Sequence, residues 1–186
     1  MSVCEVPGSG ARHATRRGAR ALLLLLALLA VSAASDALGP EIGRPAPALI
    51  VQRLDGTRFD LAALRGKVVI LNYWATWCAP CRAEMPVLEA FYRRYAEQGL
   101  VLLGLSVDDA HDRRAVADVM RQFSYPAALA SDAKPDGFGP PLAVPTTLVI
   151  DSAGIVRARL MSGAAVSTES LTQLVVPLLP AAGAAH

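Results

Sequence analysis

The stretch Trp77-Cys78-Ala79-Pro80-Cys81 decides how the rest of the chain is interpreted. It follows the apolar run 68–74 and precedes a helical pattern that extends from 82 to 98. Two cysteines three positions apart, where a strand passes into a helix, form the signature of a redox-active dithiol. Cys78 is expected at the helix N-terminus, where unpaired N–H groups and the helix dipole stabilise the reactive thiolate. Pro80 suits the first helical turn because no hydrogen bond is lost there. The stretch therefore predicts thiol–disulfide exchange chemistry.

Two other interpretations of the cysteine pair have less support in the sequence. A structural zinc ion requires about four ligands, and the remaining candidates are scattered through the chain: Cys4, His13, His111 and His186. A purely structural disulfide between Cys78 and Cys81 would close a very short loop, so it would constrain the unfolded chain little. His111 lies in the acidic segment 108–112, where we expect it to be a solvated residue at the start of a helix.

The first 35 residues have the three parts of a secretory signal. Residues 1–20 carry four arginines, the run 21–34 is apolar, and small residues occupy 32–35. An apolar run of this length is shorter than the roughly 20 residues that span a bilayer. We therefore expect a periplasmic, exported protein that is cleaved between 33 and 37. An uncleaved anchor in the inner membrane, formed by residues 21–34, is the alternative.

Removal of the leader changes the charge of the chain. The whole sequence has a formal net charge of +2, whereas the part from Asp36 onward has 14 Lys and Arg against 15 Asp and Glu. No basic patch remains to indicate nucleic-acid binding. Cys78 and Cys81 are the only cysteines of the exported part, so they must exchange with thiols or disulfides of other molecules. That requirement fits an oxidising compartment.

A chain of 186 residues favours a single globular domain. We expect a linker over 36–47, the domain over 48–180 and a flexible tail over 181–186. The expected strands are 48–54, 57–59, 68–73, 100–107, 127–130, 146–151 and 155–161. The expected helices are 61–64, 82–98, a helix capped by Asp108 or Asp109 that runs to 123, and 168–176. This order predicts an α/β sandwich with a central mixed sheet and an N-terminal β-hairpin extension.

Four segments carry a resemblance to a known family: 64–69, 72–82, 84–86 and 144–147. Together they make the region 59–163 resemble thioredoxin-fold proteins of the TlpA/ResA/DsbE-like group. The resemblance implies a thioredoxin-like fold and an exported or membrane-tethered thiol–disulfide oxidoreductase, usually a reductant, that needs no cofactor and works as a monomer. It also implies a redox disulfide between Cys78, the attacking thiol, and Cys81, the resolving thiol.

The resemblance further assigns substrate binding and partners. Pro145 would be a cis-proline that follows Val144, and the loop of these two residues would bind extended client backbone. Trp77 would be half exposed and accessible to a client. Because a reductant in an oxidising compartment must be recharged, the implied partners are client protein disulfides and a membrane thiol electron donor of the DsbD/CcdA kind. The implied clients are haem-attachment thiols of apocytochrome c or cysteines of copper sites.

Glu84 is the remaining candidate catalytic residue. It lies three positions after Cys81, so both side chains are expected on one helix face, which Leu88 continues as the core stripe. A carboxylate there is partly desolvated and has a raised pKa, so it can accept or return the Cys81 proton. The alternative is an ordinary surface glutamate. Asn72 stands where thioredoxins carry a buried aspartate; an amide cannot titrate, so the acid–base role would move to Glu84.

Three rival functions stay open at this point. A disulfide-forming oxidant would use the same residues with a higher reduction potential. A non-enzymatic copper-binding module would bind metal without turnover. A peroxiredoxin attacks peroxide with a lone cysteine that follows Thr and Pro, and residues 77–81 do not match that pattern.

Overall fold

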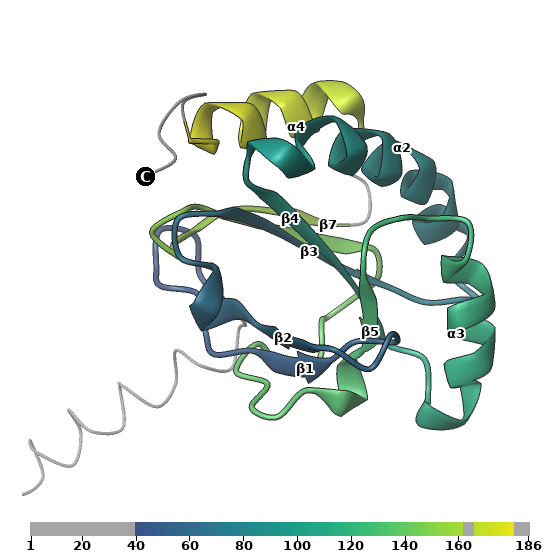
Figure 1. Cartoon of the computed structure of the whole chain (residues 1–186). Coiled ribbons are helices and arrows are strands. Elements are labelled where there is room, and N and C mark those ends of the chain that lie inside the picture. The colour runs from purple at the N-terminus through teal and green to yellow at the C-terminus, as the bar shows by residue number, and fades with distance from the viewer. Residues whose placement is uncertain (1–39, 162–165, 181–186) are drawn as a thin grey trace, which may run out of the picture. The chain divides into compact units, whose positions relative to one another are not determined.

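The structure is a computed structural model that describes residues 40–161 and 166–180 (Figure 1). The predicted leader, the first part of the predicted linker and the predicted tail over 181–186 lie outside the described residues. No helix within the described ranges is long and apolar enough to cross a membrane.

A five-stranded mixed sheet forms the centre of the fold, with the strand order β5-β4-β3-β6-β7. Its strands are β3 (Val68–Trp74), β4 (Leu100–Ser106), β5 (Ala127–Leu129), β6 (Thr146–Ile150) and β7 (Val156–Met161). Strands β3, β4 and β5 are parallel, whereas β6 and β7 pair antiparallel. Every residue of β3 is buried, as expected of a central strand with both faces covered.

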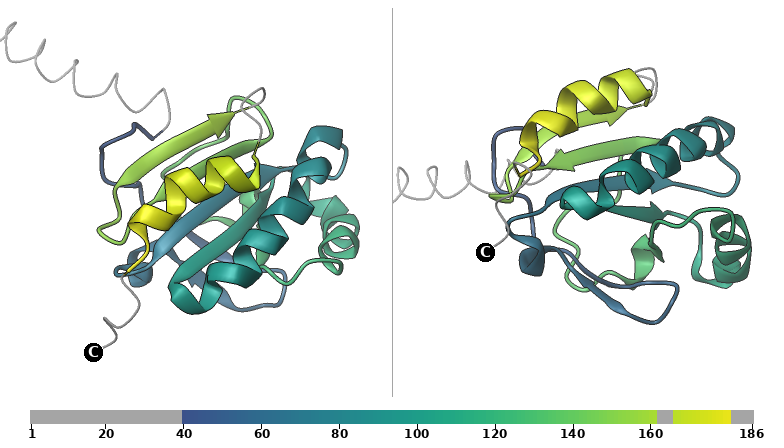
Figure 2. Two further views of the ribbon diagram at one scale, coloured as in Figure 1. Left: turned by 90° about the horizontal axis from the view of Figure 1, so that it is seen from above. Right: turned by 45° about the horizontal axis from the view of Figure 1, so that its top comes forward.

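Helices cover one face of the sheet and a β-hairpin covers the other (Figures 1 and 2). Over this face lie α2 (Ala79–Tyr95) and α4 (Thr168–Val175), whereas α3 (Arg113–Met120) lies at the edge of the sheet beside β5 and packs into the same core. The hairpin pairs β1 (Ile50–Gln52) with β2 (Arg58–Asp60). Side chains alternate along β3: Ile70 and Trp74 pack with the helices, whereas Leu71 and Tyr73 pack with the hairpin. The predicted α/β sandwich with an N-terminal hairpin is confirmed.

Short 3-10 turns complete the connections: Leu61–Leu64, Ala96–Gln98, Ala110–Asp112, Ala130–Asp132 and Val176–Leu178. Asp60 caps the first of them, since its carboxylate accepts the Ala62 N–H at 3.1 Å. Gly99 ends the unit that begins with α2. Its φ of +90° lies in the left-handed region, which favours glycine because other residues are strained there. The predicted stop at Gly99 is confirmed.

Two predicted boundaries were wrong. Gly43 and Ala46 lie in the predicted linker, yet their N–H groups bond to the carbonyls of Val156 and Gly154 at 2.8 Å. The folded domain therefore begins a few residues before position 48. The helix predicted after β4 has no side-chain cap from Asp109, and Asp108 is buried and bonds elsewhere, as described below.

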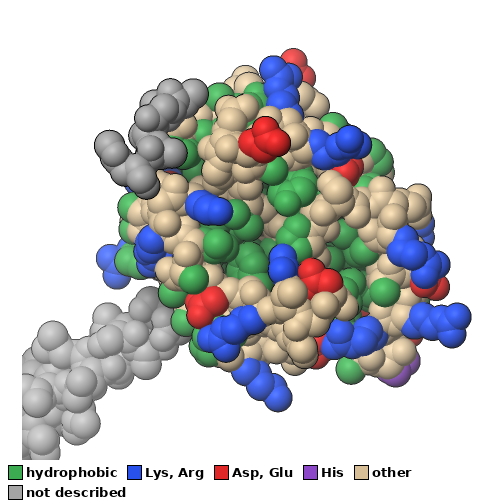
Figure 3. Space-filling model, viewed as in Figure 1, with side chains coloured by type: hydrophobic (Ala, Val, Ile, Leu, Met, Phe, Trp, Pro, Cys, Tyr) green, Lys and Arg blue, Asp and Glu red, His purple; other side chains and the backbone are tan. Residues whose placement is uncertain are grey.

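Hydrophobic side chains gather on one face of the surface. In the face seen in Figure 3, hydrophobic side chains gather near the centre and most charged ones lie around it. Only three large hydrophobic residues in the described ranges are exposed: Ile42, Trp77 and Leu142. Two of them, Trp77 and Leu142, line the same pocket.

Candidate active site

The dithiol lies at the N-terminus of α2, directly after the carboxyl end of β3. Cys78 and Cys81 are joined by a disulfide, with 5.3 Å between their Cα atoms. Cys78 is the N-cap of the helix, and its Sγ accepts the backbone N–H of Cys81 at 3.2 Å. This N–H group and the positive end of the helix dipole would stabilise negative charge on the sulfur after reduction. The predicted placement of Cys78 is confirmed.

The residues around the disulfide differ sharply in exposure. Cys78 and Cys81 are buried, whereas Trp77 is 71% exposed. The indole is thus more accessible than the predicted half exposure. The helix starts at Ala79, which agrees with the expected positions of Cys78 at its N-terminus and Pro80 in its first turn, and it continues through Pro86 without interruption.

Asp108 holds the segment that leads into the dithiol. Its two carboxylate oxygens accept three hydrogen bonds: from the Thr76 N–H at 2.9 Å, from Thr76 Oγ1 at 2.6 Å and from Ser106 Oγ at 2.6 Å. The contact ties the end of β4 to the loop before Cys78. The sequence predicted Asp108 or Asp109 as a helix cap and did not indicate this role of Asp108. The register of the parallel strands β3 and β4 could have indicated this contact. Trp74 pairs with Ser106, so Thr76 and Asp108, two positions beyond these strand ends, lie next to each other.

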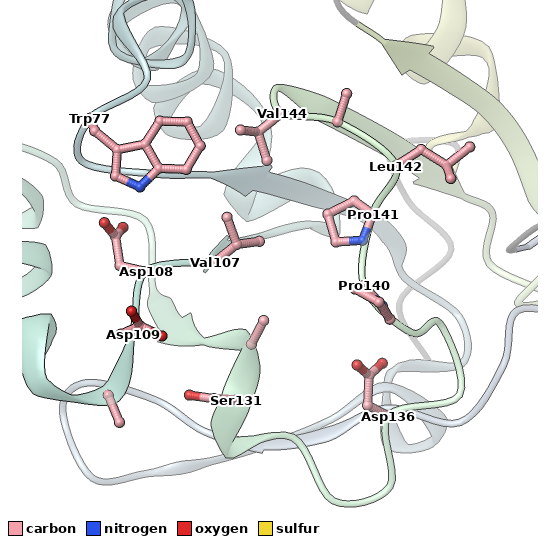
Figure 4. Close-up of a pocket in the computed structure, with 13 residues that line it drawn as sticks. Trp77, Val107, Asp108, Asp109, Ser131, Asp136, Pro140, Pro141, Leu142 and Val144 are labelled. Carbon is pink, nitrogen blue, oxygen red and sulfur yellow. The ribbon is translucent and has the colours of Figure 1, made fainter.

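The loop before β6 forms a second boundary of the site. The Val144–Pro145 peptide bond is cis, as the resemblance implied, and Pro145 is buried. Val144 lines a pocket of about 490 Å³ together with Trp77 (Figure 4). The structure thus brings the predicted residues Trp77 and Val144 together at one pocket, and Trp77 directly precedes Cys78.

Glu84 lies one helical turn after Cys81 and is partly buried. Its Oε2 is buried and has no hydrogen-bond partner within the described residues. The pKa of Glu84 is raised because burial desolvates the carboxylate, and the backbone N–H of Val166 offsets part of that effect. The predicted partial desolvation of Glu84 is confirmed.

Asn72 is buried in β3, and it shares a strand face with Ile70 and Trp74, which pack against the helices. Its Nδ2 donates to Thr147 Oγ1 at 2.9 Å, across the pairing of β3 with β6. The amide is therefore engaged in a neutral hydrogen bond, and it supplies no titratable group.

His111 lies in the 3-10 turn before α3 and is exposed, which confirms its prediction as a solvated residue at a helix start. Ligand atoms of Asp109, His111 and Asp112 lie within 4.8 Å of one another. No cysteine belongs to this group, and exposed acidic residues commonly lie together without a metal.

A redox disulfide at the N-terminus of a helix, on a mixed sheet flanked by helices, defines a thioredoxin-fold thiol–disulfide oxidoreductase. Comparison with known proteins supports this class. The AhpC/TSA family matches residues 42–159, more than half of the sequence, so the chain belongs to this family.

Among known proteins, the chain is similar to ResA thiol-disulfide oxidoreductases and to a solved thiol:disulfide interchange protein. The thiol-disulfide oxidoreductase ResA of Bacillus cereus is 34% identical over 123 residues, which cover 65% of this chain and 70% of that protein. ResA of Geobacillus thermodenitrificans is 32% identical over 145 residues, which cover 73% and 80%. The crystal structure of a thiol:disulfide interchange protein from Chlorobium tepidum matches with a TM-score of 0.63 and 28% identity, over 75% of this chain and 99% of that one.

Proposed function

We propose that this oxidoreductase works as a disulfide reductase for exported client proteins. The observation that carries the proposal is the arrangement at the start of α2, where Cys78 caps the helix and a desolvated Glu84 lies one turn after the buried Cys81. The Ala79-Pro80 dipeptide between the cysteines adds no histidine that would stabilise the thiolate further. Less thiolate stabilisation favours a reducing couple, because strong oxidants owe their potential to a stabilised reduced form.

The reaction follows from the order of the two sulfurs. The Cys78 thiolate attacks one sulfur of a client disulfide, the client S–S bond breaks, and the second client sulfur leaves and takes up a proton. The Cys81 thiolate then attacks the Cys78 sulfur and releases the first client thiol. The protein disulfide forms, and two electrons have moved from the protein to the client.

Glu84 supplies the proton acceptor that Cys81 requires. A buried thiol loses its proton reluctantly, and a carboxylate with a raised pKa is a better proton acceptor and donor for that thiol than an ordinary glutamate. The oxygen of Glu84 that lacks a partner within the described residues has capacity for this bond. Re-reduction of the disulfide would reverse the transfer.

The Val144-Pro145 loop and Trp77 would hold the client. The loop lies at the start of β6, next to the central strand β3, and Val144 and Trp77 line the same pocket. An extended client segment there would present its disulfide to Cys78. Geometry and family resemblance together support this role.

The leader indicates the compartment in which the protein would act, and that compartment determines which partners a reductant needs. Residues 1–35 have the pattern of a secretory signal, which supports work in the periplasm, either free or anchored by 21–34. A reductant there requires a membrane thiol donor of the DsbD/CcdA kind. Haem-attachment thiols of apocytochrome c and copper-site cysteines are the client classes that we propose.

The test is a pair of single-cysteine variants mixed with an oxidised client peptide. Cys81→Ser should accumulate a mixed disulfide between Cys78 and the peptide, visible on a non-reducing gel and abolished by dithiothreitol. Cys78→Ser should form none. Accumulation on Cys81 instead would reverse the assigned order. Stoichiometric copper binding by the wild-type protein without peptide reduction would support the copper-binding alternative instead.

A further inference from the structure

The pocket has an apolar wall at Trp77, the residue that directly precedes Cys78. Trp77 and Val144 lie along one edge of the pocket, with Leu142 and Pro141 on the neighbouring loop (Figure 4). Leu142 is 79% exposed, although its side chain is large and apolar. Two exposed hydrophobic side chains at the mouth of one pocket indicate a surface that a partner covers.

The opposite part of the pocket is acidic. Three aspartates line it, Asp108, Asp109 and Asp136, and no Lys or Arg is among the described lining residues. In Figure 4, Asp108 and Asp109 lie on one side of the cavity and Asp136 lies on the other. A pocket with this charge suits a cationic group and disfavours an anionic one.

Two of the three aspartates are available to a cationic ligand. Asp108 is buried and already accepts three hydrogen bonds. Asp109 and Asp136 are exposed, and neither forms an ion pair with Lys or Arg within the described residues. Oδ1 of Asp136 accepts the N–H groups of Phe138 and Gly139, which fixes the carboxylate at the pocket.

We propose that this pocket selects clients that carry Lys or Arg within one or two residues of the cysteine that Cys78 attacks. This inference rests on the proposed function and names the substrate class of that site. The apolar stem of the client's Lys or Arg would pack on Trp77 and Val144, while its charged head would reach Asp109 or Asp136. The indole face adds a cation–π contact.

The distance from the dithiol sets where the cation lies in the client. Trp77 directly precedes Cys78, and an extended peptide advances about 3.3 Å per residue. A neighbour of the attacked cysteine therefore reaches the pocket, whereas a residue five positions away does not. The exported part of the chain is close to neutral overall, so the selection must come from the pocket rather than from long-range steering.

The test compares three acetylated, amidated heptapeptides that have one central cysteine and are otherwise Gly and Ser apart from the two flanking residues. Arg, Gln or Glu flanks the cysteine on both sides, and each cysteine is activated as a neutral 2-pyridyl disulfide. Attack by Cys78 releases pyridine-2-thione, and Cys81 then releases the peptide thiol as the protein disulfide forms. The second-order rate constant of the reduced protein is measured for each peptide from the thione absorbance.

We expect the Arg peptide to react about tenfold faster than the Glu peptide at low salt, because each exposed ion pair contributes up to about fivefold. The Gln peptide should fall between them. High salt should shrink the ratio, since these charges are screened. Each rate is divided by the rate of the same protein with neutral 2,2′-dithiodipyridine, which removes differences in intrinsic thiol reactivity.

The double variant Asp109→Asn, Asp136→Asn should bring the Arg-to-Glu ratio close to one. Asp118→Asn is the matched control, because Asp118 is an exposed aspartate on α3 that pairs with Arg121 and does not line the pocket; it should keep the full ratio. An unchanged ratio in the double variant would overturn the selection. Failure of the wild-type protein to reduce dithiodipyridine would instead overturn the proposed reductase function.

Discussion

The two sides of the dithiol have different surroundings. Downstream of Cys78, the resolving Cys81 and Glu84 lie on a helix face that packs into the core. Upstream of it, Trp77 is exposed at a pocket lined by Asp109 and Asp136, which form no ion pair with Lys or Arg in the described part of the chain. The comparison suggests a division of labour, in which the buried side handles the proton and the exposed side chooses the client. Replacements on the two sides should therefore change different measured quantities.

The largest effect is expected from the sulfur that both sides share. Cys78→Ser should lower peptide reduction by more than about a thousandfold, because the nucleophile is lost. Single-turnover release of pyridine-2-thione measures it. Cys4→Ser is a matched control, since that cysteine lies in the predicted leader; a similar loss in this control would contradict the assignment of Cys78.

On the buried side, Glu84→Gln should slow the resolving step by about a hundredfold near neutral pH, as expected for loss of a general base. The wild-type rate should fall as the pH drops through the raised pKa of Glu84, because the carboxylate then holds its own proton. The Gln variant should lack that acid limb. Stopped-flow traces from pH 4 to 9 measure both; an unchanged rate and pH profile would refute the role.

The raised pKa of Glu84 also predicts how the stability of the protein changes with pH. A raised folded-state pKa means that folding favours protonated Glu84, so its contribution to stability is present at low pH and lost as the pH rises through that pKa. Glu84→Gln should therefore be at least as stable as the wild type at pH 7. Urea unfolding measures this; a clear loss of stability at pH 7 would mean that the carboxylate is structurally needed.

Asp108 lines the pocket and also holds the segment that leads into the dithiol, through its hydrogen bonds to Thr76. Asp108→Ala leaves the Thr76 and Ser106 donors without their charged acceptor, so it should lower the free energy of unfolding by about 2 kcal/mol. Because Trp77 follows Thr76, its fluorescence should change as well. Asp118→Ala, on the surface of α3, should cost less than about 0.5 kcal/mol. Equal stability of the two variants would show that the hydrogen bonds to Asp108 contribute little.

On the exposed side, the smallest effect is expected. Trp77→Ala should lower the rate with the Arg peptide by about fivefold relative to dithiodipyridine, since it removes one cation–π and stacking surface. The acid limb that Glu84 produces should persist, because the buried side is intact. If Trp77→Ala shifted the pH at which the rate falls, the exposed side would affect the titration of Glu84, and the proposed separation of the two sides would be wrong.

Most of the fold could be predicted because its signals are local. The continuous apolar run of β3 indicates a strand buried on both faces, Gly99 requires a left-handed conformation at the end of its helical unit, and Ser167 forms a capping box with Ser170. Each of these depends on residues that are close in the sequence.

The missed features depend on residues that are far apart in the sequence. The bonds of Asp108 to Thr76 join two strand ends across the parallel pair β3 and β4, and only the register places them together. The acidic pocket likewise combines the end of β4 with the loop that contains Asp136. That loop has no periodic pattern, so its path over the site could not be derived from composition or spacing.

The reduction potential of the Cys78–Cys81 couple tests the proposed reductase function most directly. It is measured by equilibrating the protein in thiol–disulfide buffers and trapping free thiols at each ratio. A two-electron couple near or below about −220 mV, in the range of thioredoxin and the glutaredoxins, is the result that we predict. A couple near about −120 mV, where DsbA lies, would contradict it and identify the protein as a disulfide-forming oxidant.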